Sequence, residues 1–264
     1  FLYCFREREY ILDILEMCSG QRMMTTFFRP GGLWRDVPAD FELAVRRFLR
    51  MFPARIDMYH ALLTKNPIFM DRTRQIGVIN AEEAVRWGLT GPTLRGSGPA
   101  IDLRKTQPYS GYEQYDFEVP TGTHGDVYDR YLVRMEEMRQ SLRIVQQALD
   151  KLPLGPVRSN DRKYVPPPRA ELGTSMEAVI HHFKLWTEGF QLPKGAVYSP
   201  IESPRGELGV YLESDGTSHP HRVHWRTPSF VHLQALPVLS RGHLVADLVG
   251  IIGSVDIVLG DSDR

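Results

Sequence analysis

Charged side chains interrupt an apolar stretch at the end of this 264-residue chain. The last residues read SVDIVLGDSDR, so Asp256, Asp261, Asp263 and Arg264 stand among aliphatic residues. A polar chain end is usually frayed, but the intervening apolar residues favour burial. Because a buried charge must be paired or must face a polar cavity, the segment predicts an ionic cluster or a cavity, with a disordered tail as the alternative.

A second group of charges lies in IESPRGELGVYL, where Glu202, Arg205 and Glu207 separate two apolar segments. If the flanking segments are buried strands, these charges must be paired or must line a cavity. The alternative is a surface turn with an exposed salt bridge, which would contribute little to stability.

Three other patterns give weaker evidence for a functional site. Gly96 and Gly98 flank Ser97 in LRGSGPAID, but no strand precedes and no helix follows as a phosphate-binding loop requires, which favours a tight turn. Cys4 and Cys18 are too few for a disulfide framework or a four-thiolate site, and we expect both to be core side chains. Without an HExxH motif, we expect surface or packed histidines rather than a metal site at His181, His182, His219, His221, His224, His232 and His243.

Composition excludes several classes of protein. Acidic and basic residues balance at 32 each, which argues against a general nucleic-acid surface and predicts no nucleic-acid partner. Two cysteines are typical of a reducing compartment. The sequence contains no run of 18 uninterrupted apolar residues, so it predicts no membrane span. The chain opens on the apolar FLYCF without a methionine, so we expect residues 1–264 to be the C-terminal part of a longer domain.

The elements that position these charges are mostly helical. We expect an opening helix that ends at Gly20, with Cys4, Ile11, Leu15 and Cys18 on its buried face. Helices over 39–51 and 54–65 should be separated at Pro53. Asn80 caps a short helix that ends at Gly88, and residues 90–124 are mostly loop.

The second half of the chain changes from helices to strands. Apolar residues at steps of three and four predict a long helix over 126–152. A proline-rich connector over 153–168 leads to a helix that a Thr174–Glu177 capping box begins and Gly189 ends. Short strands over 196–202, 207–213 and 222–226 precede a helical or mixed segment from about Leu244. The predicted fold is therefore mainly α, a helical bundle with a small antiparallel β-sheet in the C-terminal third.

Long segments of the chain are specific to one family. The segments FREREYILDILEMCSGQRM, LTGPTLRGSGPAIDLRKTQPYSGYEQYDFEVP, GTSMEAVIHHFKLWTEGFQLPKG, ESPRGELGVYLESDG and SVDIVLGDSDR resemble the D-type, or 49 kDa, subunit of proton-pumping NADH–quinone oxidoreductase, respiratory complex I. The resemblance covers essentially the whole chain. That family is similar to the large subunits of nickel–iron hydrogenases, which implies a hydrogenase large-subunit-like fold.

The hydrogenase relatives carry a DPCxxC pattern whose thiolates hold the metal. Here Val258 and Asp261 stand where the cysteines would be. A valine cannot ligate nickel, and one carboxylate cannot replace soft thiolates. The resemblance therefore implies that the ancestral metal site is an empty cavity, with no metal held by this chain.

The resemblance also implies a function. The chain would be the quinone-site subunit of NADH–quinone oxidoreductase, an NAD-dependent translocase of respiratory electron transport. It would form part of the quinone cavity beside the terminal four-iron cluster of a neighbouring subunit. NADH and the iron–sulfur clusters would bind to partner subunits of the peripheral arm, and this chain would bind no cofactor. It would lie at the cytoplasmic face of the bacterial inner membrane as a peripheral component, in contact with membrane-arm subunits.

Individual residues match the family's motifs. The quinone cavity would include Phe1, Leu2, Asp256, Val258 and Asp261. Arg264 and Met24 would lie near the cluster, and Arg29 and Arg205 match arginines of the motifs RPGG and PRG. No residue of this chain is assigned a catalytic role.

Two departures from the family pattern carry expectations. The quinone-ligating His and Tyr, and the Asp that partners the His, lie N-terminal to Phe1, so we expect the chain to be inactive in isolation. Many relatives carry a titratable His at the position of Met24, so we expect a weaker pH dependence of the cluster potential. The alternative is a structural scaffold subunit of a related membrane-bound hydrogenase-like complex. The missing thiolates disfavour an active hydrogenase.

Overall fold

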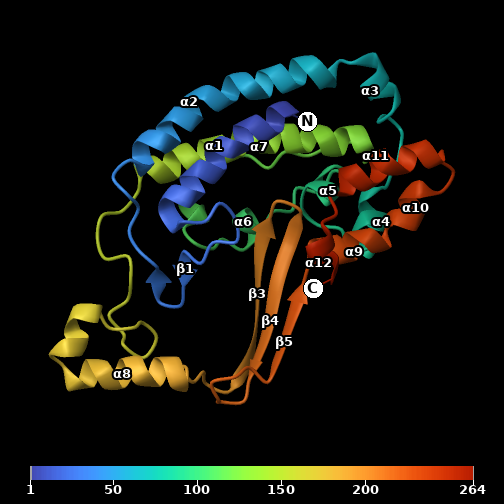
Figure 1. Cartoon of the computed structure of the whole chain (residues 1–264). Coiled ribbons are helices and arrows are strands. Elements are labelled where there is room, and N and C mark those ends of the chain that lie inside the picture. The colour runs from blue at the N-terminus through green and yellow to red at the C-terminus, as the bar shows by residue number, and fades with distance from the viewer. Residues whose placement is uncertain (1, 264) are drawn as a thin grey trace. The chain divides into compact units, whose positions relative to one another are not determined.

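The protein is described by a computed structural model that covers residues 2–263 (Figure 1). The chain is mainly helical and carries a small antiparallel sheet near its C-terminal end, as predicted. It divides into two compact units. Unit 1 contains residues up to 52, 149–195 and 213–221, and unit 2 contains residues 53–148, 196–212 and 222 onward. No helix among residues 2–263 is long and apolar enough to cross a bilayer.

Unit 1 is built from helices and a two-stranded hairpin. Its elements are α1 (Leu2–Ser19), β1 (Phe28–Arg29), β2 (Gly32–Leu33), the first part of α2 (Phe41–Tyr59), the 3-10 helix η3 (Arg169–Gly173) and α8 (Met176–Thr187). The RPGG turn joins β1 to β2. Gly32 has a φ of +139°, and a Cβ there would lie 2.3 Å from the carbonyl oxygen of Val157. Only glycine lets this hairpin lie against the proline-rich connector.

The face that α1 buries differs from the prediction. Glu7, Leu12 and Cys18 are buried, whereas Cys4, Ile11 and Leu15 are exposed. The expectation of a core position is therefore right for Cys18 and wrong for Cys4. Apolar residues occur all round this helix, so their spacing alone could not select the buried side. Glu7 is paired with Arg6 at 2.7 Å, which meets the requirement for a partner.

The predicted break at Pro53 is wrong, because α2 continues through it to Tyr59. Proline removes one backbone hydrogen bond and typically costs about 3 kcal/mol inside a helix. The apolar side chains Val45, Ile56 and Tyr59 are buried on both sides of the proline, and Phe48 stacks on Phe52 at 4.8 Å. These side chains keep helical spacing across Pro53, and their tertiary packing offsets the free-energy cost of the proline.

The start of α8 is also shifted from the prediction. Ser175, not Thr174, is the N-cap, and its hydroxyl accepts from the Ala178 N–H at 3.2 Å. Thr174 instead ends η3, and its hydroxyl donates to the Glu171 carbonyl at 3.4 Å. The short helix before α8 therefore uses the threonine that the capping-box pattern assigned to α8.

Unit 2 holds most of the remaining elements. They are the π-helix η1 (His60–Thr64), α3 (Pro67–Asp71), α4 (Ala81–Arg86), α5 (Gly91–Arg95), α6 (Leu103–Thr106), the 3-10 helix η2 (Tyr112–Gln114), most of α7 (Val127–Asp150), and α9 (Pro228–Gln234), α10 (Leu236–Ser240), α11 (Val245–Val255) and α12 (Leu259–Asp263). The long helix α7 confirms the prediction to within two residues. Short helices with proline near the start, α5, α9 and α10, were missed because they are too short to show a period.

The core of unit 2 collects side chains from segments far apart in sequence. Its buried members include Ile79, Leu94, Val127, Leu239 and Ile251. Helices α9 to α12 lie together beside this core (Figure 1). Burial of these aliphatic groups is the main favourable contribution to folding.

The three-stranded sheet has the order β3 (Gly195–Ser203), β4 (Gly206–Ser214) and β5 (Arg222–Arg226), visible side by side in Figure 1. The β3–β4 turn contacts the start of α5. A Cβ on Gly91, whose φ is +64°, would lie 2.4 Å from the Cα of Gly206. Two glycines thus bring the backbones together, which places the charges of the PRG motif beside α5.

Candidate functional site

The C-terminal segment is attached to the protein by hydrogen bonds rather than frayed. Asp256 ends α11 in the left-handed conformation, with a φ of 57°. The Ser229 hydroxyl donates to an Asp261 carboxylate oxygen at 3.0 Å, and the Thr227 hydroxyl donates to the Asp261 carbonyl at 2.5 Å. The Val258 N–H donates to Ser229 at 3.3 Å. Residues 256–263 therefore lie against the start of α9, and the disordered-tail alternative is wrong for these residues.

The end of α11 faces two arginines of unit 2. A carboxylate oxygen of Asp256 lies 4.0 Å from Nε of Arg205. Arg134, on α7, interacts electrostatically with Asp256 and Arg205. Its Nε and Nη2 atoms, and Nε of Arg205, are buried without a hydrogen-bond partner among residues 2–263. Unpaired buried N–H groups are rare, so these donors mark a polar position that can receive an acceptor.

A buried ionic network centred on Arg95 adjoins this site. The Arg95 side chain is 1% exposed. It donates to Glu137 at 2.9 Å, to Glu202 at 2.7 Å and to the Ile101 carbonyl at 2.9 Å. Glu202 also accepts from the Leu103 N–H at 3.2 Å. The prediction that Glu202 must be paired is confirmed, and the surface-turn alternative is wrong for it.

Asp102 and Arg104 extend the same network. Arg104 donates to Asp102 at 2.6 Å, and Asp102 lies 3.7 Å from Arg95. Burial alone would raise the pKa of Asp102, but the hydrogen bonds and charges of Arg104 and Arg95 hold it below its ordinary value. Burial raises the pKa of Glu137 despite its contact with Arg95.

Arginines and carboxylates gather around Arg95 and the end of α11. The arginines are Arg95, Arg104, Arg134 and Arg205, and the carboxylates include Asp102, Glu137, Glu202 and Asp256. The pairs are unevenly distributed, because the carboxylates gather around Arg95 while Arg134 keeps free donors. The network therefore leaves positive character at the position beside Asp256.

Two further buried groups fix the surrounding backbone. Arg130 donates to Ser254 at 3.0 Å and to the carbonyls of Gly77 and Gly125 at 2.9 Å each. Burial lowers the pKa of Arg130 to about 10, which leaves it charged at neutral pH. His232 accepts from the Thr90 N–H at 3.1 Å. Burial and the nearby charges of Arg226 and Arg134 lower the pKa of His232 to about 3.

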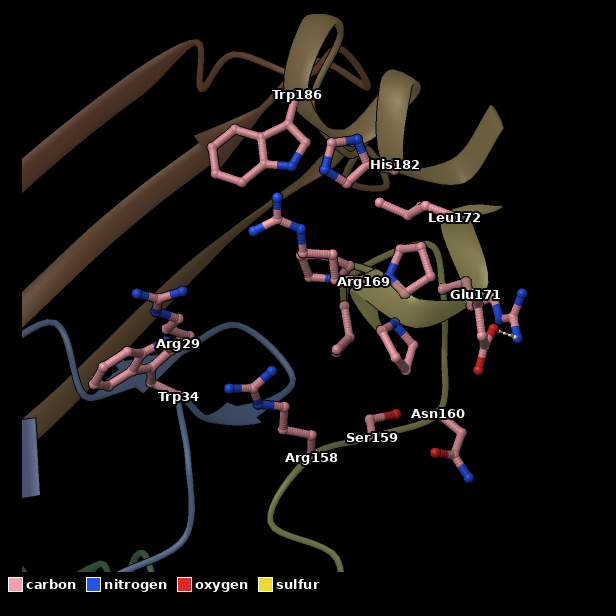
Figure 2. A pocket seen from close by; sticks show the side chains of 15 residues that line it. Arg29, Trp34, Arg158, Ser159, Asn160, Arg169, Glu171, Leu172, His182 and Trp186 are labelled. Carbon is pink, nitrogen blue, oxygen red and sulfur yellow. Dashed lines mark hydrogen bonds and ion pairs between the residues drawn. The ribbon is translucent and has the colours of Figure 1, made fainter. Parts of the chain in front are cut away.

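The other predicted site residues are distributed between the units. Asp256, Val258, Asp261 and Arg205 lie together in unit 2, whereas Leu2, Met24 and Arg29 belong to unit 1. Leu2 is exposed, and Met24 is 93% exposed with a φ of 55°. The Arg29 guanidinium lies over the Trp34 ring at 5.7 Å (Figure 2). Phe1 and Arg264 lie outside the described residues.

Sequence reasoning missed Arg95, Glu137 and Arg134. A signal for two of them was present: Asp126, Arg130, Arg134 and Glu137 recur at steps of four, four and three along one side of the long helix. Charged residues at a helical period beside an apolar stripe indicate a buried polar seam rather than a solvated face. No local pattern marked Arg95, because the two carboxylates that accept its hydrogen bonds are 42 and 107 residues away.

The described residues of the C-terminal segment do not fit a metal site, and the segment around Ser97 does not form a phosphate-binding loop. Val258 has no donor atom, and the Asp261 carboxylate already accepts from Ser229, so the donor set does not fit a nickel or iron site. Among residues 2–263, no group of three His, Cys, Asp or Glu side chains could hold a metal ion. The glycine-containing segment around Ser97 follows the short helix α5 and forms a turn, with Gly98 at a φ of +113°.

Comparison with known proteins identifies the family of the chain. The family model described as the respiratory-chain NADH dehydrogenase 49 kDa subunit matches residues 1–264. A D-type subunit of NADH-quinone oxidoreductase from Roseiflexus sp. (strain RS-1) is 60% identical over 267 residues, covering 100% of this chain and 64% of the relative. A D-type subunit of the same oxidoreductase from Chloroflexus aurantiacus is 57% identical, covering 100% and 65%.

The D-type subunit from Rhodospirillum rubrum is 53% identical, covering 100% of this chain and 67% of that relative. The chain thus spans about 64% of the length of the Roseiflexus relatives that it matches. The full-length match and the level of identity leave no ambiguity about ancestry: the chain belongs to the family of the 49 kDa subunit of respiratory-chain NADH dehydrogenase.

Proposed function

We propose that the chain forms part of the quinone cavity of a proton-pumping NADH–quinone oxidoreductase. In the C-terminal segment, Asp256, Val258 and Asp261 would form part of the cavity wall. Phe1 and Leu2 are proposed to contribute to the cavity as well, and Arg264 and Met24 to lie near the cluster. Family membership supports this proposal, because the relatives are named as subunits of that oxidoreductase.

One observation carries the proposal. The N–H groups of Arg134 that lack a partner lie beside Asp256, at the segment where the family pattern departs from a metal-ligand motif. A quinone carbonyl is an acceptor, and an oxygen that gains negative charge on reduction is a stronger one. Guanidinium N–H groups in a position shielded from water can stabilise such an oxygen.

The electrons are proposed to arrive from a four-iron cluster held by a neighbouring subunit. No group of side chains among residues 2–263 fits a cluster, and such clusters need cysteine thiolates. This chain would therefore contribute cavity wall, hydrogen-bond donors and charge. We place it on the cytoplasmic face of the bacterial inner membrane, as a peripheral component in contact with peripheral-arm and membrane-arm subunits.

The test uses the full-length subunit in its complex. Arg134→Gln is expected to lower NADH-driven quinone reduction by about tenfold, since a hydrogen bond to a charged group contributes ~1.5–3 kcal/mol. Asp256→Asn removes the negative charge that faces Arg134 and Arg205 and is expected to lower quinone reduction as well. Reduction of an artificial acceptor upstream of the quinone should be unchanged. Asp263→Asn, an exposed change in the same segment, is the matched control. Unchanged quinone reduction in an assembled Asp256→Asn complex would contradict the proposal.

Met24 gives a second test of the same function. It is fully accessible in this structure and has no titratable proton. In the complex, Met24→His is expected to increase the pH dependence of the nearby cluster's midpoint potential, toward the limit of ~59 mV per pH unit for one proton per electron. Redox titrations at several pH values measure this slope. Met24→Leu is the control, and an equal slope in both variants would refute the role of this position.

A further inference from the structure

Helix α8 is apolar on both of its sides. One side, with Ala178 and Leu185, faces the rest of unit 1 and is buried or half-buried. The opposite side is a continuous stripe of exposed apolar residues at helical spacing: Met176, Val179, Ile180, Phe183 and Trp186. Exposures of 77% for Met176, 65% for Phe183 and 71% for Trp186 are unusual for such large side chains. An exposed apolar stripe of this kind is typical of a surface that another molecule covers.

A pocket of about 980 Å³ adjoins this helix within unit 1 (Figure 2). His182 and Trp186 project into it from α8, and Arg29, Arg158 and Arg169 line its other walls. We refer to this hollow as the arginine pocket, defined by those three arginines with His182 and Trp186. Trp186 belongs to both the apolar stripe and the pocket, so the two form one continuous surface.

The arginine pocket has an excess of positive charge. Arg162 at its rim is paired with Glu171 at 2.6 Å. Among residues 2–263, Arg29 and Arg158 donate only to backbone carbonyls, those of Thr26 at 3.2 Å and Leu33 at 2.6 Å. Within residues 2–263, no carboxylate lies within 4.0 Å of the Arg29, Arg158 or Arg169 guanidinium. Three cations in one hollow favour an occupant that supplies acidic groups.

We propose that α8 and the arginine pocket together form a docking surface for another protein subunit of the same complex. The contacting segment would present apolar side chains to the stripe and carboxylates to the pocket. This inference rests on the proposed function only in requiring that the chain work within a multisubunit complex.

Two other occupants fit the charges less well. A second copy of this chain would place the same arginines near one another, because a two-fold contact pairs identical surfaces. A helix that lies on anionic lipid carries many Lys and Arg on its polar face. Helix α8 and its C-cap carry Lys184 against Glu177 and Glu188. A carboxylate-bearing protein surface satisfies both the apolar stripe and the pocket.

Carbodiimide cross-linking of the purified full complex tests the proposal. Arg169→Lys, or Arg158→Lys as a second variant, introduces an amine that the reagent can join to a neighbouring carboxylate. Mass spectrometry is expected to find an amide link to an Asp or Glu of another subunit, flanked by apolar residues. Arg86→Lys is the positive control for the reaction, because Arg86 lies 2.5 Å from Glu82 on α4 and should give an intrachain link.

Assembly provides an independent measurement. Phe183→Asp is expected to lower the fraction of the subunit recovered in the complex by about tenfold, as for a central apolar contact of an interface. Leu154→Asp, at a fully exposed apolar position outside α8 and the pocket, should leave assembly unchanged. Circular dichroism of each variant chain checks that folding is retained.

Links to lipid alone, or normal assembly of the Phe183→Asp subunit with no intersubunit link, would overturn the proposal. Both readouts are independent of quinone turnover. A complex that assembles and cross-links as expected but loses no activity in the Asp256→Asn variant would count against the proposed function while leaving the docking surface intact.

Discussion

Replacing Arg95 with methionine is expected to lower the free energy of unfolding of the purified chain by about 3–5 kcal/mol. Arg95 is buried and holds Glu137 and Glu202 by direct hydrogen bonds. Methionine retains much of the volume but leaves both carboxylates without their cation. A buried charge that loses its partner incurs most of its desolvation cost. Urea denaturation at pH 7 measures the change.

The matched control is Arg86→Met. That arginine forms an ion pair with Glu82 one turn away on α4, and both side chains are about three-quarters exposed. Exposed pairs of this kind contribute about 0.3–0.5 kcal/mol. If Arg95→Met destabilises the chain no more than Arg86→Met does, the network is not a determinant of stability.

His232→Gln is expected to reduce the loss of stability of the chain in mild acid. The folded-state pKa of His232 is about 3, because the buried ring is poorly solvated and lies near Arg226 and Arg134. In the unfolded chain the pKa is about 6.5. Between these values the unfolded state binds a proton that the folded state does not, so stability rises with pH. Above about pH 6.5 both states are neutral and the contribution is constant.

The size of this effect follows from the two pKa values. Lowering the pH from 7 to 5 should cost the folded state about 2 kcal/mol through this one histidine. Gln keeps an acceptor for the Thr90 N–H but does not titrate. The measurement is the difference in unfolding free energy between pH 7 and pH 5, compared with the same difference for His232→Gln. The control His224→Gln changes an exposed ring, and an equal acid response in all three proteins would contradict the assignment.

The parts of the fold that the sequence predicted share one property: their signal is local and repeats several times. The helix over 126–152 repeats its apolar step often enough to be recognised, and the structure places α7 at Val127–Asp150. The strands predicted over 196–202 and 207–213 flank a turn that Pro204 and Gly206 mark, and the structure places β3 at Gly195–Ser203 and β4 at Gly206–Ser214. Elements whose pattern depends on residues a few positions apart can therefore be recognised from the sequence.

The parts that could not be predicted depend on distant contacts. The continuation of α2 through Pro53 reflects burial of Ile56 and Tyr59, which local propensity does not contain. The exposed positions of Cys4 and Ile11 depend on which side of α1 meets its neighbours. At the candidate site, family resemblance indicated Asp256 and Val258. The supporting cation Arg95 emerged only when its partners, far apart along the chain, were placed around it.

The network around Arg95 also limits how early unit 2 can finish folding during its synthesis. Glu202 is added 107 residues after Arg95. At about 5–20 residues per second, ribosomal synthesis takes roughly 5–20 s to supply it. Once Glu137 has been added, the nascent chain contains Arg95 and Glu137 but still lacks Glu202, and the β3–β4 hairpin that contacts α5 does not yet exist. The ionic network of unit 2 can therefore be completed only after β3 and β4 have been translated. Its completion is a late step in the folding of the newly made chain.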